Sequence, residues 1–262
     1  MTKLAITGAT GRMGTRLVAL AKQDSDFEVV AAIDRPDAPE IYKDAGEVAG
    51  IGSIGLPITF DLRPTPDVLI DFTTPSSMRH WLKTCRDRGI ALLIGTTGLA
   101  PSDYAAIDQA AEKIAVLQSP NMSLGVNLLF KIAGEVAKLL GDDYDIEIVE
   151  GHHRFKKDAP SGTAMGLADA ILKATGKSKD RLIFDRHGED VQRQPGDIGM
   201  HALRIGDEVG RHTAYFAALG ERLELTHVAT NRDTFVRGAL RAAKWLAGKK
   251  PGRYTIADVL GM

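Results

Sequence analysis

The segment from Glu150 to Thr163 gathers most of the side chains in this sequence that could transfer a proton or bind an anion. It contains the adjacent histidines His152 and His153, followed by Lys156 in a run that holds two further basic residues. Histidine gives and accepts protons near neutral pH, and a lysine ammonium group can donate one. A lone histidine is more often structural than catalytic, but two histidines beside a lysine favour chemistry. We therefore expect at least one of them to be catalytic.

The end of this segment, Ser161-Gly162-Thr163, is expected to begin a helix. Free backbone N–H groups and the positive end of the helix dipole favour a carboxylate at such a position. Lys156 and His153 can add positive charge or hydrogen-bond donors, so the segment predicts a site for an anionic substrate. No metal site is predicted, because adjacent histidines that leave a strand tend to point apart and no cysteine or carboxylate spacing completes a ligand set.

A glycine cluster near the start of the chain is the second candidate site. It consists of Gly8, Ala9, Thr10, Gly11, Arg12, Met13 and Gly14 and stands between a predicted strand, 4–7, and a predicted helix, 14–23. Glycines there permit a tight turn and a close approach of backbone N–H groups to a pyrophosphate. The G-x-x-G-x-x-G spacing departs from the common dinucleotide fingerprint, so a purely structural turn is the alternative.

Asp34 and Arg35 favour the dinucleotide interpretation. Asp34 ends the second predicted strand, 28–33, twenty residues after Gly14, where an acidic side chain accepts hydrogen bonds from the ribose hydroxyls of NAD. Arg35 could pair with a 2′-phosphate, so the couple is compatible with both NADH and NADPH. The alternative for Arg35 is a solvated surface charge.

Three further loops follow apolar runs that read as strands, namely 68–72, 91–95 and 114–117. Open α/β sheets bind ligands at the carboxyl ends of their strands, so these loops are expected to border the cofactor. The last of them could line the nicotinamide end or serve as an interdomain hinge. The predicted loop residues are Asp71-Phe72-Thr73, Gly95-Thr96-Thr97-Gly98 and Ser119-Pro120-Asn121-Met122.

The elements that must position these residues predict an α/β protein with two domains. Strands that alternate with helices at 76–88 and 102–112 indicate a Rossmann-like, doubly wound parallel sheet. A second, α+β domain follows with helices at 124–140 and 161–175, a strand at 145–149 and a mainly antiparallel or mixed sheet. Runs 198–205, 209–218 and 221–228 predict an antiparallel meander, and the helix 234–246 could return to the first domain. We expect a dinucleotide-binding domain, 1–123 plus 233–262, and a substrate-binding and oligomerisation domain, 124–232.

Composition excludes several classes of partner. Thirty-three basic and thirty-four acidic side chains give a formal net charge of −1, so neither nucleic acid nor an anionic membrane is an expected partner. No stretch approaches the roughly 18 apolar residues of a membrane span. Cys85 is the only cysteine, so an internal disulfide is excluded and a buried structural thiol is expected. These features predict a cytoplasmic protein.

The same motifs resemble the dihydrodipicolinate reductase family over essentially the whole chain. The most specific is Glu-x-His-His-Arg-x-Lys-x-Asp-Ala-Pro-Ser-Gly-Thr, which stands at 150–163 without a gap. The resemblance implies reduction of dihydrodipicolinate, or of its hydroxylated precursor, to tetrahydrodipicolinate with NADH or NADPH, in the diaminopimelate and lysine pathway. It implies His152 as general acid/base, Lys156 as proton donor, Thr97 near both ligands, and a homotetramer built through the second-domain sheet. The residues implied to hold the substrate carboxylates are His153, Lys156, Ser161, Gly162 and Thr163.

Two other functions fit parts of the pattern. One is a reductase or dehydrogenase of another small amino or imino acid, such as an aspartate dehydrogenase, and the intact histidine loop argues against it. The other is a protein that senses NADPH without catalysis, which the joint presence of His152 and Lys156 disfavours.

Overall fold

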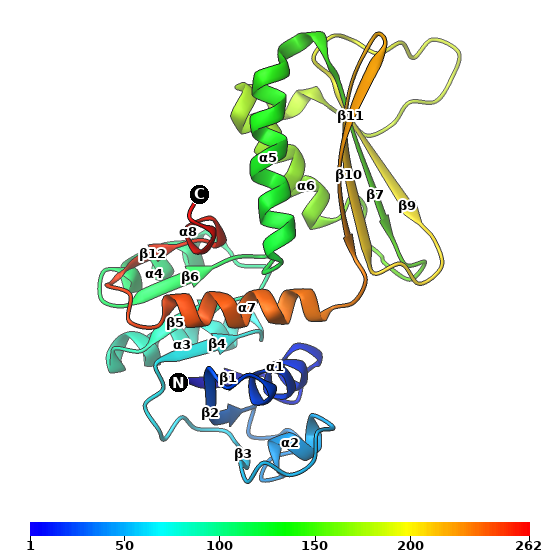
Figure 1. Cartoon of the computed structure of the whole chain (residues 1–262). Helices are drawn as coiled ribbons and strands as arrows, with labels where there is room; N and C mark the ends of the chain where they lie inside the picture. The colour runs from blue at the N-terminus through cyan, green and yellow to red at the C-terminus, as the bar shows by residue number, and fades with distance from the viewer. The chain divides into compact units, whose positions relative to one another are not determined.

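The computed structural model describes all residues from 1 to 262, and they form two compact units (Figure 1). Unit 1 comprises Met1–Leu124 and Asp233–Met262, so the chain leaves it once and returns. Unit 2 comprises Gly125–Arg232. Each unit has a sheet and a core of its own.

The sheet of unit 1 has seven strands, all parallel, in the order β12-β6-β5-β4-β1-β2-β3. This confirms the predicted Rossmann-like sheet. Two short strands, β3 and β12, were not anticipated because runs of two and three residues show no periodicity. The strands are β1 (Thr2–Thr7), β2 (Phe27–Ile33), β3 (Ile58–Thr59), β4 (Val68–Asp71), β5 (Ala91–Ile94), β6 (Ala115–Gln118) and β12 (Gly252–Tyr254).

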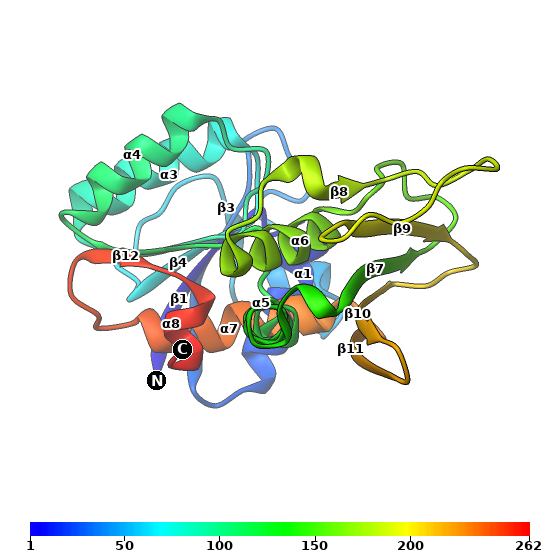
Figure 2. The same cartoon turned by 90° about the horizontal axis from the view of Figure 1, so that it is seen from above.

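Helices cover both faces of this sheet, as Figure 2 shows from above. Side chains of a strand alternate between the two faces, so Leu4 and Ile6 pack in one core with α1 and α7 while Ala5 packs in the other with α3 and α4. Both faces are apolar because both are covered. The helices are α1 (Arg12–Gln23), α2 (Ala45–Val48), α3 (Pro75–Arg88), α4 (Pro101–Ala111), α7 (Asp233–Leu246) and α8 (Ile256–Leu260).

Helix α3 shows how local sequence sets the bounds of an element. It begins after Thr74, whose hydroxyl accepts a hydrogen bond from the backbone N–H of Ser77, and it ends at Gly89 in the left-handed conformation. Cys85 lies on its inner face and is fully buried, as predicted. Burial raises the pKa of this thiol to about 12, which leaves it unreactive.

The sheet of unit 2 corrects the predicted meander. Its order is β11-β10-β7-β9-β8, so β10 and β11 form the expected antiparallel hairpin, but β7 lies between β10 and β9 and pairs with β9 in parallel. Ile146 and Ile148 of β7 are almost fully buried, which suits a central strand. Periodicity identifies strands but not their partners. The strands are β7 (Asp145–His152), β8 (Leu182–Ile183), β9 (Ile198–Arg204), β10 (Gly210–Ala218) and β11 (Glu221–Ala229).

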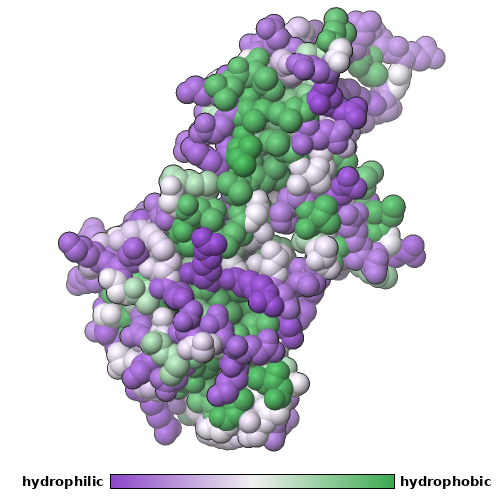
Figure 3. Space-filling model, viewed as in Figure 1, coloured by the Kyte–Doolittle hydropathy of each residue, from purple (hydrophilic) through white to green (hydrophobic).

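One face of this sheet packs against α5 (Leu124–Leu140) and α6 (Gly162–Thr175). Two short 3-10 helices, η1 (Gly141–Asp143) and η2 (Lys179–Arg181), complete the unit. Leu128, Ile132 and Leu139 of α5 are exposed. Figure 3 shows an apolar area over this helix. No helix in either unit is both long and apolar enough to cross a membrane.

Candidate functional site

Unit 1 contains a cavity of about 650 Å³ at the carboxyl edge of its sheet. Five of the residues predicted to bind a cofactor line it: Gly8, Thr10, Gly11, Asp34 and Arg35. Four of the other lining residues have flat rings, and of these four only Phe72 lies in a predicted loop. They are Phe60, Phe72, His80 and Trp81, and flat rings of this kind suit a planar, partly apolar group such as a purine base.

The glycine turn has the geometry that a pyrophosphate needs. Gly8 adopts a φ of 67°, in the left-handed region. A Cβ at Gly14 would lie 2.0 Å from the backbone oxygen of Gly8, so only glycine lets the helix approach the turn this closely. Helix α1 begins at Arg12, directly after Gly11, so its free N–H groups and positive end lie at this turn. The residues present therefore fit a dinucleotide.

Asp34 fixes the glycine turn to the end of β2. One carboxylate oxygen accepts hydrogen bonds from the backbone N–H and the hydroxyl of Thr10, at 2.9 and 2.8 Å, and the other accepts one from the N–H of Arg35. The Arg35 side chain is 70% exposed and pairs only with Asp37, which is itself exposed. Both carboxylate oxygens of Asp34 thus already accept hydrogen bonds from the protein, whereas the exposed Arg35 guanidinium can turn toward an anion.

Asp71 joins the end of β1 to two of the predicted loops, 71–73 and 95–98. It is fully buried, and its carboxylate accepts hydrogen bonds from the hydroxyls of Thr7, Thr73 and Thr96. Burial raises the pKa of Asp71 above its ordinary value, against the opposing effect of these hydroxyl donors. Thr96 also accepts a hydrogen bond from the N–H of Thr73 at 2.9 Å. The Thr96 hydroxyl is therefore already hydrogen-bonded within the protein, so the backbone of Thr96 would make any contact with a ligand.

The other predicted cofactor residues do not line this cavity. Arg12 and Pro120 are exposed, as is Thr97, while the side chains of Ala9 and Met122 are buried in the core of unit 1. Ser119 donates to the backbone oxygen of Asn121, which shapes the turn after β6. The remaining two are Met13, which packs against the core, and Gly95, which is buried against Phe72.

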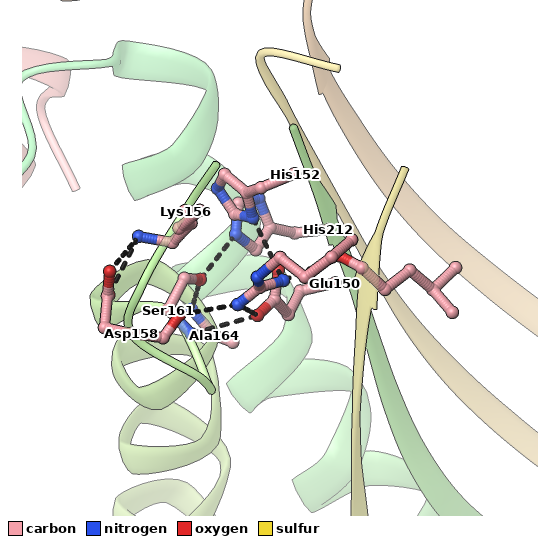
Figure 4. A network of polar contacts seen from close by, with 9 residues as sticks. Glu150, His152, Lys156, Asp158, Ser161, Ala164 and His212 are labelled. Carbon is pink, nitrogen blue, oxygen red and sulfur yellow. Dashed lines mark hydrogen bonds and ion pairs between the residues drawn. The ribbon is translucent and has the colours of Figure 1, made fainter. Parts of the chain in front are cut away.

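In unit 2, the second candidate site centres on a buried carboxylate, Glu150 (Figure 4). Glu150 and His152 stand two residues apart on β7 and so share one face, and His152 Nδ1 contacts Glu150 Oε2. A carboxylate can only accept here, so Nδ1 carries the proton and Nε2 is the nitrogen left for chemistry. Arg204 binds both oxygens of Glu150 at 2.9 and 3.0 Å.

The Glu150 carboxylate also contacts the start of helix α6. Its Oε1 accepts a hydrogen bond from the backbone N–H of Ser161 at 3.1 Å. Burial alone would raise the pKa of Glu150, but the hydrogen bonds and charges of Arg204 and His152 together hold it below its ordinary value. Glu150 is therefore an anion at neutral pH, and it joins the candidate acid/base to the candidate anion-binding helix.

Ser161 caps α6 and contacts a second buried histidine, His212 on β10. Its hydroxyl oxygen accepts a hydrogen bond from the N–H of Ala164 at 3.1 Å and lies 3.0 Å from His212 Nε2. Burial lowers the pKa of His212 to about 4, and the nearby His152 adds to this effect, so the ring is neutral.

The predicted lysine lies in the loop between β7 and α6. The ammonium nitrogen of Lys156 contacts both oxygens of Asp158 at 2.8 Å, and Asp158 is largely exposed. His153 is half-buried and its Nδ1 has no hydrogen-bond partner. Gly162 is exposed at the first turn of α6, beside Thr163. The structure thus brings His152, His153, Lys156 and the helix start into one unit.

Three residues of this network, Glu150, Arg204 and His212, were not assigned roles from the sequence. The period of two along β7 could have paired Glu150 with His152. No comparable signal existed for the other two. Arg204 lies opposite His152 on β9, and His212 lies opposite Glu150 on β10, so both depend on a strand order that the sequence does not reveal.

Both units of this chain are similar to known proteins. Residues 2–122 match the family model of the dihydrodipicolinate reductase N-terminus, and residues 125–260 match that of its C-terminus. The 4-hydroxy-tetrahydrodipicolinate reductase of Anaeromyxobacter dehalogenans (strain 2CP-C) is 48% identical over 267 residues, covering 100% of this chain and 98% of the relative. That of Myxococcus xanthus (strain DK1622) is 45% identical, with coverage of 100% and 98%.

A solved structure shares the fold. Dipicolinate-bound dihydrodipicolinate reductase from Paenisporosarcina sp. TG-14 aligns with a TM-score of 0.78 and 24% identity, over 97% of each chain.

Proposed function

Since this chain belongs to the dihydrodipicolinate reductase family, we propose that it catalyses the NAD(P)H-dependent reduction of dihydrodipicolinate, or of its hydroxylated precursor, to tetrahydrodipicolinate. This is an oxidoreductase reaction of the diaminopimelate and lysine pathway. The observation that carries the proposal is the joint attachment of His152 and the α6 start to one buried carboxylate, Glu150. A proton carrier and an anion site are thereby held in one place.

The substrate is bound, in this proposal, by the start of α6 and the loop before it. Gly162 and Thr163 in the first turn of α6, the hydroxyl of Ser161 and the positive end of the helix dipole would hold a carboxylate. Lys156 is only 19% exposed, whereas its partner Asp158 is 64% exposed, so Lys156 can exchange this bond for a bond to substrate. His153 supplies a further donor. Such donors fit a dicarboxylate better than an uncharged ring.

The proton steps fall to His152 and Lys156. When bound, the nicotinamide supplies a hydride, so the reduced ring also needs one proton. Glu150 accepts a hydrogen bond from Nδ1–H of His152, which fixes the tautomer and stabilises the charged imidazolium form. Nε2 is thereby the nitrogen available for proton transfer. Lys156 would donate the one proton to the reduced ring, and His152, as general acid/base, would supply the proton that restores the charged form of Lys156.

A test of the substrate class uses two inhibitors that differ by one carboxylate. Pyridine-2,6-dicarboxylate should compete with the substrate, and pyridine-2-carboxylate should bind about tenfold or more weakly, because it lacks one charge-assisted set of hydrogen bonds. Inhibition constants from initial rates decide this. Equal inhibition by the two compounds would contradict a substrate that is bound through two carboxylates.

We further propose that the enzyme uses both NADH and NADPH, with Arg35 binding the 2′-phosphate. Replacing Arg35 by alanine should raise the KM for NADPH about tenfold or more and leave that for NADH nearly unchanged, because only NADPH carries the phosphate. Asp34→Ala should weaken both, since Asp34 also anchors Thr10. Steady-state titration of each cofactor measures these effects.

A matched control is available in Arg63→Ala. Arg63 is an exposed arginine of unit 1 that pairs with Asp61 as Arg35 pairs with Asp37, but it does not line the cavity. This variant should leave both cofactors unaffected. If Arg35→Ala weakened NADH and NADPH equally, Arg35 would not read the phosphate.

The proposal includes a homotetramer in the cytoplasm. The face of the unit 2 sheet opposite α5 and α6 carries no helix and exposes Leu203 and Val228, so it offers a surface for another copy. The single thiol is buried and has no disulfide, which suits a reducing compartment. Light scattering on the purified protein and cell fractionation measure the two properties.

A further inference from the structure

His212 is a buried histidine to which the mechanism above gives no task. It is 4% exposed and faces the site from β10, opposite Glu150 in the strand register. Its ring lies edge-on to that of His152, with centroids 5.1 Å apart and planes at 73°. Figure 4 shows it between His152 and the start of α6. A polar ring placed this deep beside a catalytic residue requires an explanation.

The contact with Ser161 supplies one. A hydroxyl group has one proton and two lone pairs. One lone pair of Ser161 Oγ already accepts the N–H of Ala164. If His212 Nε2–H donates to the other, both lone pairs are occupied, and the hydroxyl proton can point only outward, toward a bound anion.

The opposite tautomer would have two disadvantages. The Ser161 proton would be donated inward to Nε2 and lost to the substrate. His212 Nδ1 would then carry a proton, although this atom is buried and has no hydrogen-bond partner. A bare nitrogen at that position leaves only a lone pair unused, whereas an N–H there would be an orphaned donor.

We propose that His212 is a positioning residue that holds the Ser161 hydroxyl as a donor to a carboxylate of the substrate. This inference rests on the proposed function, because it assigns a task in binding the dicarboxylate. The neutral state of the ring agrees with it, since the pKa of His212 is lowered to about 4. His212 therefore takes no part in proton transfer and acts on affinity rather than on the chemical step.

Substitutions at His212 separate the donor from the bulk of the ring. His212→Leu keeps an apolar volume but removes the donor, and should raise the substrate KM and the inhibition constant of pyridine-2,6-dicarboxylate about tenfold. Glutamine places an amide N–H near the position of Nε2, so His212→Gln should stay within about threefold of the wild type. Cofactor affinity should not change, and kcat at saturating substrate should fall by less than about threefold.

A double-mutant cycle with Ser161→Ala decides between positioning and a general structural role. If His212 acts through the hydroxyl, His212→Leu should cause no further loss of pyridine-2,6-dicarboxylate affinity once that hydroxyl is gone. Additive losses, or a leucine variant with wild-type affinity, would overturn the inference. Should the leucine variant not fold, His212→Asn serves in the same cycle, because its shorter amide does not reach Ser161.

Measurements on the wild-type protein distinguish a failure of the role proposed for His212 from a failure of the proposed function. A wild type that neither binds pyridine-2,6-dicarboxylate nor reduces dihydrodipicolinate would refute the function, and the inference with it. A wild type that does both, combined with an additive cycle, would refute only the role of His212.

Discussion

Replacing His152 by glutamine is expected to lower kcat by roughly 10²- to 10⁴-fold, the contribution that a positioned general acid or base usually makes. Glutamine retains a similar length and polarity but cannot transfer a proton at neutral pH. The affinity for NADH and NADPH should stay near the wild-type value, because the glycine turn and its cavity belong to unit 1 and His152 to unit 2. Steady-state rates and cofactor titration measure both quantities.

His187→Gln is the matched control for this substitution. His187 also belongs to unit 2 and also contacts a carboxylate, that of Asp185, but its side chain is 85% exposed and lies outside the network of Glu150. Its replacement should leave kcat unchanged. A His152→Gln enzyme with more than about half of the wild-type kcat would remove His152 from the mechanism.

Glu150→Gln is expected to have the next largest effect, on both rate and stability. Glutamine cannot hold the Nδ1–H tautomer of His152 with the same strength, so kcat should fall by about 10²-fold or more. Arg204 would also lose its buried counter-charge, which typically costs roughly 3 to 5 kcal/mol. In the His152→Gln background the same change should lower stability but scarcely alter the residual rate. Equal loss of rate in both backgrounds would show that Glu150 does not act through His152.

The pH dependence of unfolding checks the charge of Glu150. Because the pKa of Glu150 is lowered in the folded protein, its stabilising contribution is present above the unfolded value of about 4.3 and is lost as the pH falls through the folded one. The difference in Tm between wild type and Glu150→Gln should therefore shrink as the pH falls from about 6 to about 3. A constant difference would mean that Glu150 is uncharged in the native state.

Local signals in the sequence predicted much of this protein. The alternation of strands and helices gave the parallel sheet of unit 1, and the helix at 124–140 has the predicted bounds. The glycine cluster, Asp34 and Arg35 line one cavity because they follow adjacent parallel strands. These predictions succeed because each depends on residues close in sequence or on a general property of parallel sheets.

Long-range pairing explains the failures. The meander prediction was wrong because nothing local shows that β7 inserts between β9 and β10. The same insertion brings Arg204 and His212 to Glu150 from positions 54 and 62 residues away in sequence, so the polar network could not be assembled in advance. The aromatic residues in the cavity lining were missed for a different reason, because Phe60 and Trp81 read individually as ordinary apolar residues.

The central claim is that this chain reduces a cyclic dicarboxylate imine, and one measurement addresses it directly. Purified protein is mixed with NADH or NADPH and freshly generated dihydrodipicolinate, and the loss of reduced cofactor is followed against a reaction without substrate and against acyclic imines made from 2-oxo acids and ammonia. We predict rapid oxidation of both cofactors with the cyclic substrate alone. Cofactor that binds but is not oxidised, or that is oxidised faster with an acyclic imine, would contradict the account.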